Sequence, residues 1–419
     1  MKIKTRQTDI DRALALCAPK HRRPKKPNLA FRTLIRALSV PDMLATKFTY
    51  TKHNMDAAGK GPYLILMNHS CFLDLEIASR ILRPMPYCIV CTSDGFVGKE
   101  WLMRQIGCIP TKKFVTDLTL VSDIVHTLKK EKTSVLMYPE ASYSFDGRAT
   151  PLPRHLGRLI KRLKVPVLTI ITEGAFLHNP LYNCLQKRKT RVSAKLTCLL
   201  TARDVDTLSA EEIDEKLDGA FSFDNFARQL ETKTKITEPF RADGLNRILY
   251  KCSACGAEGQ MTGKGTELFC GACKKTWHMD EYGRLAAKEG KTEFSHIPDW
   301  YAWERQQVKE EITGGTYALD TPVDLCIMAD YKAIHRVGQA HLTHGPSGFH
   351  FTGFNGKLDY RQSVTSSYGL YADYYWYELG DVICIGNGDR LYYCFPHKPD
   401  VVAKTRLAAE ELYKLAKNK

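Results

Sequence analysis

Residues 67–76 read MNHSCFLDLE and place a histidine, His69, five positions before an aspartate, Asp74. The apolar run YLILM leads into this stretch, and the helical pattern LEIASRIL leads out of it. A strand that ends just before His69 and a helix that begins at Asp74 leave a turn short enough to return the carboxylate to the imidazole. Asp74 would then fix the ring tautomer in which the other nitrogen is free to take a proton. An exposed histidine followed by a helix cap fits the same residues, because aspartate is a common capping residue.

Short apolar runs alternate with helical patterns throughout residues 60–200. The runs of strand length are YLILMN, YCIVCT, SVLMYPE and VPVLTII, and the helical patterns are LEIASRIL, KEWLMRQI, TLVSDIVHTLKK and HLGRLIKRL. Such alternation predicts an α/β layer fold. Cys88 and Cys91 lie inside one of these apolar strands, so we interpret them as core residues and not as a redox or metal pair.

Four of the fourteen cysteines form two pairs with the spacing of a metal site. Cys252 and Cys255 are followed, after fourteen residues, by Cys270 and Cys273. Four thiolates on two tight turns can surround a tetrahedral zinc, and a closed set of four leaves no open position for water. We therefore predict a zinc ribbon with a structural zinc. The remaining cysteines have no regular spacing and are typical of reduced core residues in a reducing compartment.

The chain divides into regions of different composition. We expect a basic amphipathic segment at residues 1–44, the α/β domain at 45–245, the zinc ribbon at 246–290, and a helical linker with a β-rich C-terminal domain at 291–419. The last region is rich in tyrosine and turn signals and ends in the amphipathic pattern DVVAKTRLAAEELYKLAK. Antiparallel strands capped by one terminal helix are the outline of a pleckstrin-homology-like barrel, which is the topology we expect there.

The charge balance indicates an anionic partner. Lysine and arginine number 61 against 46 acidic residues, which gives a net charge of +15. This charge suits phospholipid headgroups, a phosphorylated metabolite or nucleic acid. The ribbon mixes both signs and lacks a basic stripe with aromatic stacking platforms, which argues against nucleic acid. No apolar stretch approaches the roughly 20 residues that span a bilayer, and the N-terminus lacks the apolar core of a signal peptide, so we expect a cytoplasmic protein.

A basic run, KHRRPKKP at residues 20–27, precedes an amphipathic pattern. Phe31, Leu34, Ile35 and Leu38 recur there at helical spacing beside two arginines. Such a helix either docks on the domain behind it or lies in the membrane interface, with its apolar face among acyl chains and its cations on anionic headgroups. The second alternative predicts a peripheral membrane protein.

Three further segments follow MNHSCFLDLE in order: IGCIPTKKF at 106–114, MYPEASYSFDGR at 137–148 and VPVLTI at 165–170. Together the four blocks resemble the glycerolipid acyltransferases of the phosphatidic-acid-synthesising type, over about residues 45–240. The blocks of that family are a His and an Asp separated by four residues, a glycine-containing strand with a basic end, a Pro-Glu-Gly-Thr segment, and an apolar strand with a central proline. The resemblance implies the fold of that family, a mixed sheet flanked by helices.

The resemblance also implies roles for individual residues. His69 would be the general base that takes the proton from the acceptor hydroxyl, and Asp74 would orient it. Lys112 and Lys113 stand where the family places an arginine, and we expect them to bind the phosphate of the acceptor. Glu140 keeps the glutamate of the third block, and we expect it to shape the acceptor site.

The third block departs from the family pattern after its glutamate. The tripeptide ASY, which contains Ser142 and ends at Tyr143, replaces the usual glycine, threonine and arginine. We retain Ser142 as an expected substrate contact. The positive charge of the family arginine is missing, and Arg148, Arg154 or Arg158 from the following segment would be candidates to replace it.

The predicted function is transfer of a fatty acyl group from a thioester, acyl-CoA or acyl-acyl-carrier-protein, to the free hydroxyl of a lysophospholipid. The expected acceptor is 1-acylglycerol 3-phosphate, and the product would then be phosphatidic acid. The acceptor hydroxyl is itself the nucleophile, so the reaction needs no acyl-enzyme. The alternative is a non-catalytic zinc-ribbon protein that binds anionic lipid or nucleic acid through its charge.

Overall fold

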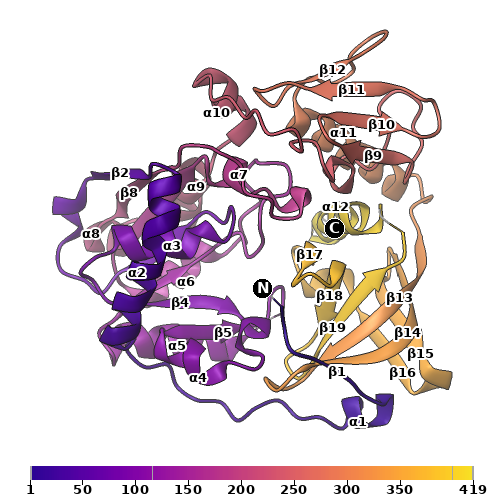
Figure 1. Cartoon of the computed structure of the whole chain (residues 1–419). Helices are drawn as coiled ribbons and strands as arrows, with labels where there is room; N and C mark the ends of the chain where they lie inside the picture. The colour runs from indigo at the N-terminus through magenta and orange to yellow at the C-terminus, as the bar shows by residue number, and fades with distance from the viewer. Residues whose placement is uncertain (1, 116, 399, 418–419) are drawn as a thin grey trace.

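The computed structural model describes residues 2–115, 117–398 and 400–417. It contains three sheets, of which the first has seven strands in the order β2-β8-β7-β3-β6-β4-β5 (Figure 1). These strands are β2 (Thr49–His53), β3 (Leu64–Met67), β4 (Tyr87–Thr92), β5 (Cys108–Thr111), β6 (Ser134–Met137), β7 (Val167–Glu173) and β8 (Ser193–Leu200). Strand β8 runs antiparallel to β7, and the other neighbours are parallel. The expected mixed sheet is therefore present.

Helices cover both faces of this sheet, because its strands are apolar on both sides. Along β3, Leu64 and Leu66 contribute to one apolar cluster, whereas Ile65 and Met67 contribute to another. The helices of this region are α2 (Leu29–Ala45), α3 (Leu73–Ile81), α4 (Glu100–Gln105), α5 (Leu118–Lys129), α6 (Leu156–Leu163), α7 (Ala175–His178), α8 (Ala202–Thr207), α9 (Ala210–Ala220) and α10 (Asn225–Glu231). Helix α3 packs in the cluster of Ile65, and α5, α6 and α9 pack in the cluster of Leu64.

Cys88 and Cys91 lie in β4, as expected, and contribute to different faces of the sheet. Cys88 is buried in the cluster of Leu64, and Cys91 packs against the cluster of Ile65. Two thiols on opposite faces of one strand cannot share a metal ion, so the core interpretation of this pair is confirmed.

The N-terminal segment contacts two parts of the molecule, the C-terminal sheet and the first domain. Strand β1 (Thr5–Gln7) pairs in parallel with β14 of the C-terminal sheet, and the short helix α1 (Ile10–Leu14) follows it. The chain then returns to the first sheet, where α2 contacts α3. The expected amphipathic helix is thus present, but Leu34 and Leu38 remain exposed. Within the described ranges, no helix is long and apolar enough to span a bilayer.

The ribbon is a four-stranded antiparallel sheet in the order β12-β11-β10-β9. Its strands are β9 (Met261–Lys264), β10 (Glu267–Cys270), β11 (Thr276–Met279) and β12 (Leu285–Ala287). Helix α11 (Ile297–Thr313) packs against it, with the rings of Trp277 and Trp300 in edge contact at 5.0 Å. The segment expected as a linker is therefore part of the ribbon core.

The third sheet forms the β-rich C-terminal region. Its strands run in the order β16-β15-β14-β13-β19-β18-β17, with β1 added on β14. They are β13 (Leu319–Met328), β14 (Ile334–Gly345), β15 (Gly348–Gly353), β16 (Leu358–Gln362), β17 (Tyr371–Trp376), β18 (Gly380–Gly386) and β19 (Leu391–Pro396). Helix α12 (Val401–Lys417) follows the last strand and contacts α11, β17 and β18. Figure 1 shows α12 between the ribbon and this sheet.

Short 3-10 helices occupy several of the connections. They are η1 (Met55–Ala58), η2 (Ser93–Phe96), η3 (Leu181–Asn183), η4 (Leu245–Arg247), η5 (Phe354–Gly356) and η6 (Val364–Ser366). One of them, η2, contacts both β4 and β5 near the strand ends that carry the expected site.

Candidate active site

His69 lies at the carboxyl end of β3, directly before α3. Its Nδ1 lies 2.9 Å from Oδ2 of Asp74, in the first turn of that helix. The same oxygen accepts the backbone N–H groups of Ser70 at 2.8 Å and Cys71 at 3.2 Å. The turn therefore closes on the carboxylate, and the structure brings His69 and Asp74 together as the sequence predicts.

Asn68, the residue before His69, connects the end of β3 to β7. Its side chain is fully buried, and its Oδ1 accepts the backbone N–H of Thr172 in β7 at 2.8 Å. Its amide group donates to Ser70 Oγ at 3.1 Å. These bonds hold the residues on both sides of His69 against the neighbouring strand.

A single segment encloses His69, and we call residues 138–150 the covering loop. Glu140 Oε2 accepts the His69 backbone N–H at 2.9 Å, and the Ser144 N–H donates to the His69 carbonyl at 3.3 Å. The rings of Tyr138 and Tyr143 stack on the imidazole, with centroid distances of 4.0 and 3.9 Å. The two tyrosines leave the His69 side chain only 13% exposed.

Burial determines the protonation state of this pair. It lowers the pKa of the His69 imidazole well below its ordinary value of 6.5, and the ammonium of Lys113 adds to the effect. Burial raises the pKa of the Asp74 carboxyl, and the N–H groups of Ser70 and Cys71 oppose that rise. His69 is therefore neutral at pH 7, and an ionised Asp74 would keep the ring hydrogen on Nδ1, the nitrogen that faces it. The lone pair of Nε2 is then available to take a proton.

Glu140 acts on the backbone of the site. It is buried, and its second oxygen, Oε1, accepts the N–H of Thr150 at 2.8 Å and the Thr150 hydroxyl at 3.0 Å. Burial raises the pKa of Glu140 to about 7, against the effect of these N–H donors. One carboxyl group thus joins the end of β3 to both ends of the covering loop.

The two lysines of the second block point to different places. Lys113 Nζ lies 5.6 Å from the ring centroid of Tyr143 and 4.6 Å from that of Tyr371 in β17. Lys112 instead donates to the carbonyl of Gly388, between β18 and β19. The structure therefore places Lys113 beside the tyrosine that covers His69, and it places Lys112 against the C-terminal sheet.

The residues that replace the family sequence after Glu140 have structural roles. Ala141 has φ of 55°, a left-handed conformation that glycine adopts more readily. The hydroxyl of Ser142 is buried and donates to the carbonyl of Tyr143 at 3.3 Å. Tyr143, in the position of the missing arginine, presents its ring to His69. The altered segment therefore keeps the glycine-like turn but puts an aromatic ring where the family has a cation.

The three arginines suggested as replacements for that cation have other surroundings. Arg148 pairs with Asp224 at 2.8 Å and with Asp299 at 2.7 Å. Arg154 is exposed and lies 3.1 Å from Asp218, and Arg158 is exposed on α6. The structure places none of these three beside His69 in the contacts described.

Several residues of the site are not evident from the sequence. Tyr138 directly precedes Pro139 and Tyr143 lies three positions after Glu140, and nothing in this spacing indicates that both rings stack on His69. Asp94 and Asp373 act on Lys113 through their charges, and burial raises the pKa of Asp373 to about 7. Asp94 Oδ2 accepts the Tyr371 hydroxyl at 2.9 Å. These contacts join η2 to the C-terminal sheet, and a local motif carries no sign of them.

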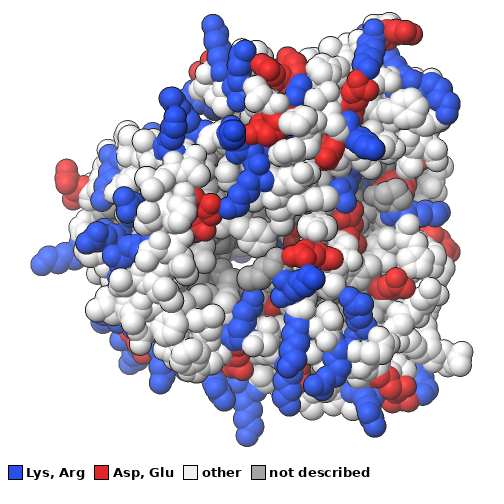
Figure 2. All heavy atoms as spheres, viewed as in Figure 1, with Lys and Arg blue, Asp and Glu red and all other residues white. Residues whose placement is uncertain are grey.

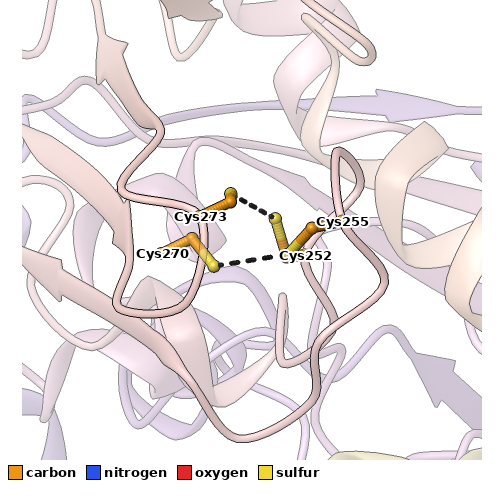
Figure 3. A group of neighbouring side chains, drawn as sticks. All are labelled: Cys252, Cys255, Cys270 and Cys273. Carbon is orange, nitrogen blue, oxygen red and sulfur yellow. Dashed lines mark hydrogen bonds between the residues drawn. The ribbon is translucent and has the colours of Figure 1, made fainter.

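The four predicted ribbon cysteines converge on one point (Figure 3). Their sulfur atoms all lie within 4.8 Å of one another. The Sγ atoms of Cys252 and Cys273, and those of Cys255 and Cys270, are 3.8 Å apart. Tetrahedral zinc with Zn–S bonds of about 2.3 Å has sulfur separations of about 3.8 Å, so the spacing fits that ion.

Comparison with known proteins gives a family match in the first domain. Residues 47–173 match the model of the Acyltransferase family. Among solved structures, the chain is similar to PlsC, the 1-acyl-sn-glycerophosphate (LPA) acyltransferase from Thermotoga maritima, with 15% sequence identity and a TM-score of 0.36. That similarity covers 48% of this chain and 79% of the PlsC chain. No curated protein matches the chain. The family match includes His69, Asp74 and Glu140, and it confirms the family resemblance for the domain that holds them.

The protonation state of His69 can be tested directly. We expect its Cε1–H resonance, identified by its absence in His69→Gln, to titrate below pH 6.5, because burial lowers the pKa of the ring. The unfolded chain then takes up a proton that the folded chain lacks, so this residue lowers stability as the pH falls below the ordinary value. His69→Gln should lose less stability than the unchanged protein between about pH 6.5 and pH 5 in urea unfolding. A resonance that titrates at or above pH 6.5 would contradict the assignment.

Proposed function

We propose that this protein transfers a fatty acyl group from a thioester to the free hydroxyl of a lysophospholipid, and the match of residues 47–173 to the Acyltransferase family supports this. The proposed acceptor is 1-acylglycerol 3-phosphate, which would give phosphatidic acid. The proposed donor is acyl-CoA or acyl-acyl-carrier-protein. The observation that carries the proposal is the bond of 2.9 Å between His69 and Asp74 at the end of β3.

In this reaction His69 acts as the general base. Its Nε2 takes the proton of the acceptor hydroxyl while the hydroxyl oxygen attacks the thioester carbonyl. The carbon–sulfur bond then breaks, the ester bond forms, and the departing thiolate receives the proton back from the imidazolium. Asp74 keeps the ring oriented and stabilises the positive charge that forms on it. The stacked rings of Tyr138 and Tyr143 exclude water from both faces of the base.

The remaining residues of the blocks contribute to the acceptor site. We assign the acceptor phosphate to Lys113, since its ammonium is the cation that acts on His69. Glu140 and Ser142 shape the site through the backbone of His69 and Tyr143. Lys112, with its ammonium on Gly388, is a weaker candidate for the phosphate.

The C-terminal parts have proposed roles of their own. A structural zinc held by Cys252, Cys255, Cys270 and Cys273 would stabilise the ribbon, because four thiolates close the coordination shell. The strand order of the third sheet and its terminal helix support the pleckstrin-homology-like topology.

We also propose that the protein docks through α2 on an anionic membrane surface at the cytoplasmic side. Leu34 and Leu38 on α2 are 50% and 68% exposed, and Trp101 of the adjacent α4 is 67% exposed. The basic run before α2 is largely exposed. Figure 2 shows many Lys and Arg side chains along the lower part of the molecule. Figure 1 places the stretch between α1 and α2, which contains the basic run, along the same part. Apolar insertion combined with cations fits a surface rich in acidic lipids.

The acyl-transfer proposal is tested by turnover of purified protein with lysophosphatidic acid and each type of donor. We expect His69→Ala to lower kcat by about 10²- to 10⁴-fold, the usual value of a general base. His53→Ala removes an exposed histidine from β2 of the same domain and should leave kcat unchanged.

Two results would overturn the proposal. Equal turnover in His69→Ala and the unchanged protein would show that His69 is not the base. A folded protein without turnover on either donor, which still binds anionic vesicles or nucleic acid, would favour the non-catalytic alternative.

The zinc proposal predicts about one zinc per chain in protein purified without chelators. Cys255→Ser should lose zinc and unfold the ribbon at a lower temperature, because the coordination shell is opened. Cys17→Ser is the matched control, since Cys17 and Cys255 are both exposed and only Cys255 belongs to the cluster. Metal analysis that finds no zinc, or equal zinc in both variants, would contradict this proposal.

The membrane proposal predicts binding to vesicles that contain acidic phospholipid. The double variant Leu34→Asp, Leu38→Asp should bind at least about tenfold more weakly, because insertion of each leucine is worth about 1.5 kcal/mol or more. Leu230→Asp on α10 is the matched control for the single variant Leu38→Asp, since both replace one exposed leucine by one negative charge. Equal weakening by both substitutions, measured by vesicle sedimentation, would exclude α2 as the docking surface.

A further inference from the structure

The terminal helix α12 contacts the covering loop through one buried arginine. The side chain of Arg406 is 4% exposed, and its Nη1 donates to the carbonyl of Tyr143 at 3.2 Å. Its guanidinium also lies 4.0 Å from the ring centroid of Phe145. Arg406 and Tyr143 are 263 positions apart, so this contact joins the C-terminal region to the third block of the acyltransferase domain.

Tyr143 transmits this contact to the catalytic pair. Its carbonyl accepts the bond from Arg406, and its ring stacks on His69 with an interplanar angle of 28°. The bond from Arg406 restricts the backbone of Tyr143, and Glu140 separately holds the loop through Thr150. The position of the Tyr143 ring therefore depends on α12 as well as on its own loop.

A buried arginine needs a physical reason, because taking its charge out of water is costly. Its partner in α12 is Glu410, whose Oε1 lies 3.3 Å from Arg406 Nε. Arg305 of α11 pairs with the same Glu410 at 2.7 Å, and the described contacts of Arg305 do not include Tyr143. The carboxylate therefore has a second cation, and what Arg406 adds is the bond to the covering loop.

We propose that Arg406 is a positioning residue for acyl transfer, which holds Tyr143 on the face of His69 and so couples the C-terminal region to the catalytic base. The part of this inference that concerns rate rests on the proposed function. The part that concerns the surroundings of His69 does not, since the imidazole can be observed without substrate.

Loss of the bond has a defined effect on His69. The charged and titratable groups that face its ring or backbone are Asp74 from α3, Lys113 after β5, and Tyr138, Glu140 and Tyr143 from the covering loop. Only Tyr143 among them contacts Arg406 directly in the described hydrogen bonds. When its ring loosens, water reaches one face of the imidazole, and the pKa of His69 rises toward its ordinary value of 6.5.

The test uses the full chain with Arg406→Met, which keeps an unbranched side chain over Phe145 but removes the donor. The His69 resonance should titrate at higher pH than in the unchanged protein. We expect kcat to fall about ten- to hundredfold with little change in KM, and its acid limb to move to higher pH. Arg406→Lys keeps a donor and should restore part of both properties.

Arg305→Met is the matched control, because it removes a cation from the same carboxylate without touching Tyr143. It should leave the titration of His69 unchanged. Tyr143→Ala removes the ring itself and should reproduce the shift of Arg406→Met, and the double variant should shift no further. This second variant keeps the proposal testable if Arg406→Met does not fold.

An unshifted His69 titration in folded Arg406→Met, or an equal shift in Arg305→Met, would overturn the positioning role. Absence of turnover in the unchanged protein would instead overturn the proposed function. The titration would still decide whether α12 controls the surroundings of His69, so the two failures are distinguishable.

Discussion

The carboxyl group of Glu140 is the constraint on which the rest of the site depends. It accepts N–H groups from His69 at 2.9 Å and from Thr150 at 2.8 Å, so it ties the tip of β3 to the covering loop. An amide side chain would present an NH2 group to one of these donors and leave that N–H unsatisfied in a buried place. The site therefore requires two acceptor oxygens here, which accounts for a carboxyl group at a buried position, where burial raises its pKa to about 7.

The closed loop accounts for the neutral histidine that the proposed reaction requires as its base. Tyrosine rings on both faces remove water from His69, and the loss of solvation disfavours the imidazolium. A lowered pKa makes the base weaker but ensures that it is unprotonated at neutral pH. In the proposed reaction Asp74 compensates for this, because its carboxyl group, 2.9 Å from the ring, would stabilise the positive charge that develops there. Burial by the tyrosines thus destabilises the protonated form of His69, whereas Asp74 stabilises it.

Local patterns were sufficient to predict the first sheet and the contact between His69 and Asp74. His69 and Asp74 are five positions apart, and the strand end and helix start between them are each visible as an apolar pattern. Cys252, Cys255, Cys270 and Cys273 were predictable because two short turns carry them. For the two lysines, the sequence could not decide which one faces the site. The structure separates them, since adjacent residues at a strand end point to different sides.

Long-range contacts between ordinary residues could not be predicted. Strand β1 has three residues, too few to show a period, and it pairs with a strand more than 300 positions later. In the sequence, Tyr143 was notable only because it replaces the arginine of the family pattern. Its partner Arg406 lies in an amphipathic pattern that is typical of any terminal helix, so nothing in the sequence linked the two residues. Such pairs form when parts that are distant in the sequence pack together. The local sequence around each partner is consistent with an ordinary structural role. The family match ends at residue 173, before either the ribbon or α12 begins.

The ribbon is connected to the same helix that holds the covering loop. Lys251 and Glu258 of the ribbon, Glu311 of α11 and Lys404 of α12 form a four-membered ion-pair network, with nitrogen to oxygen distances of 2.7 to 3.2 Å. Each lysine contacts both carboxylates, so removal of any member leaves a net charge in this partly buried network. Lys404 is two residues before Arg406 on α12. The fold of the ribbon and the placement of Tyr143 on His69 therefore depend on one helix.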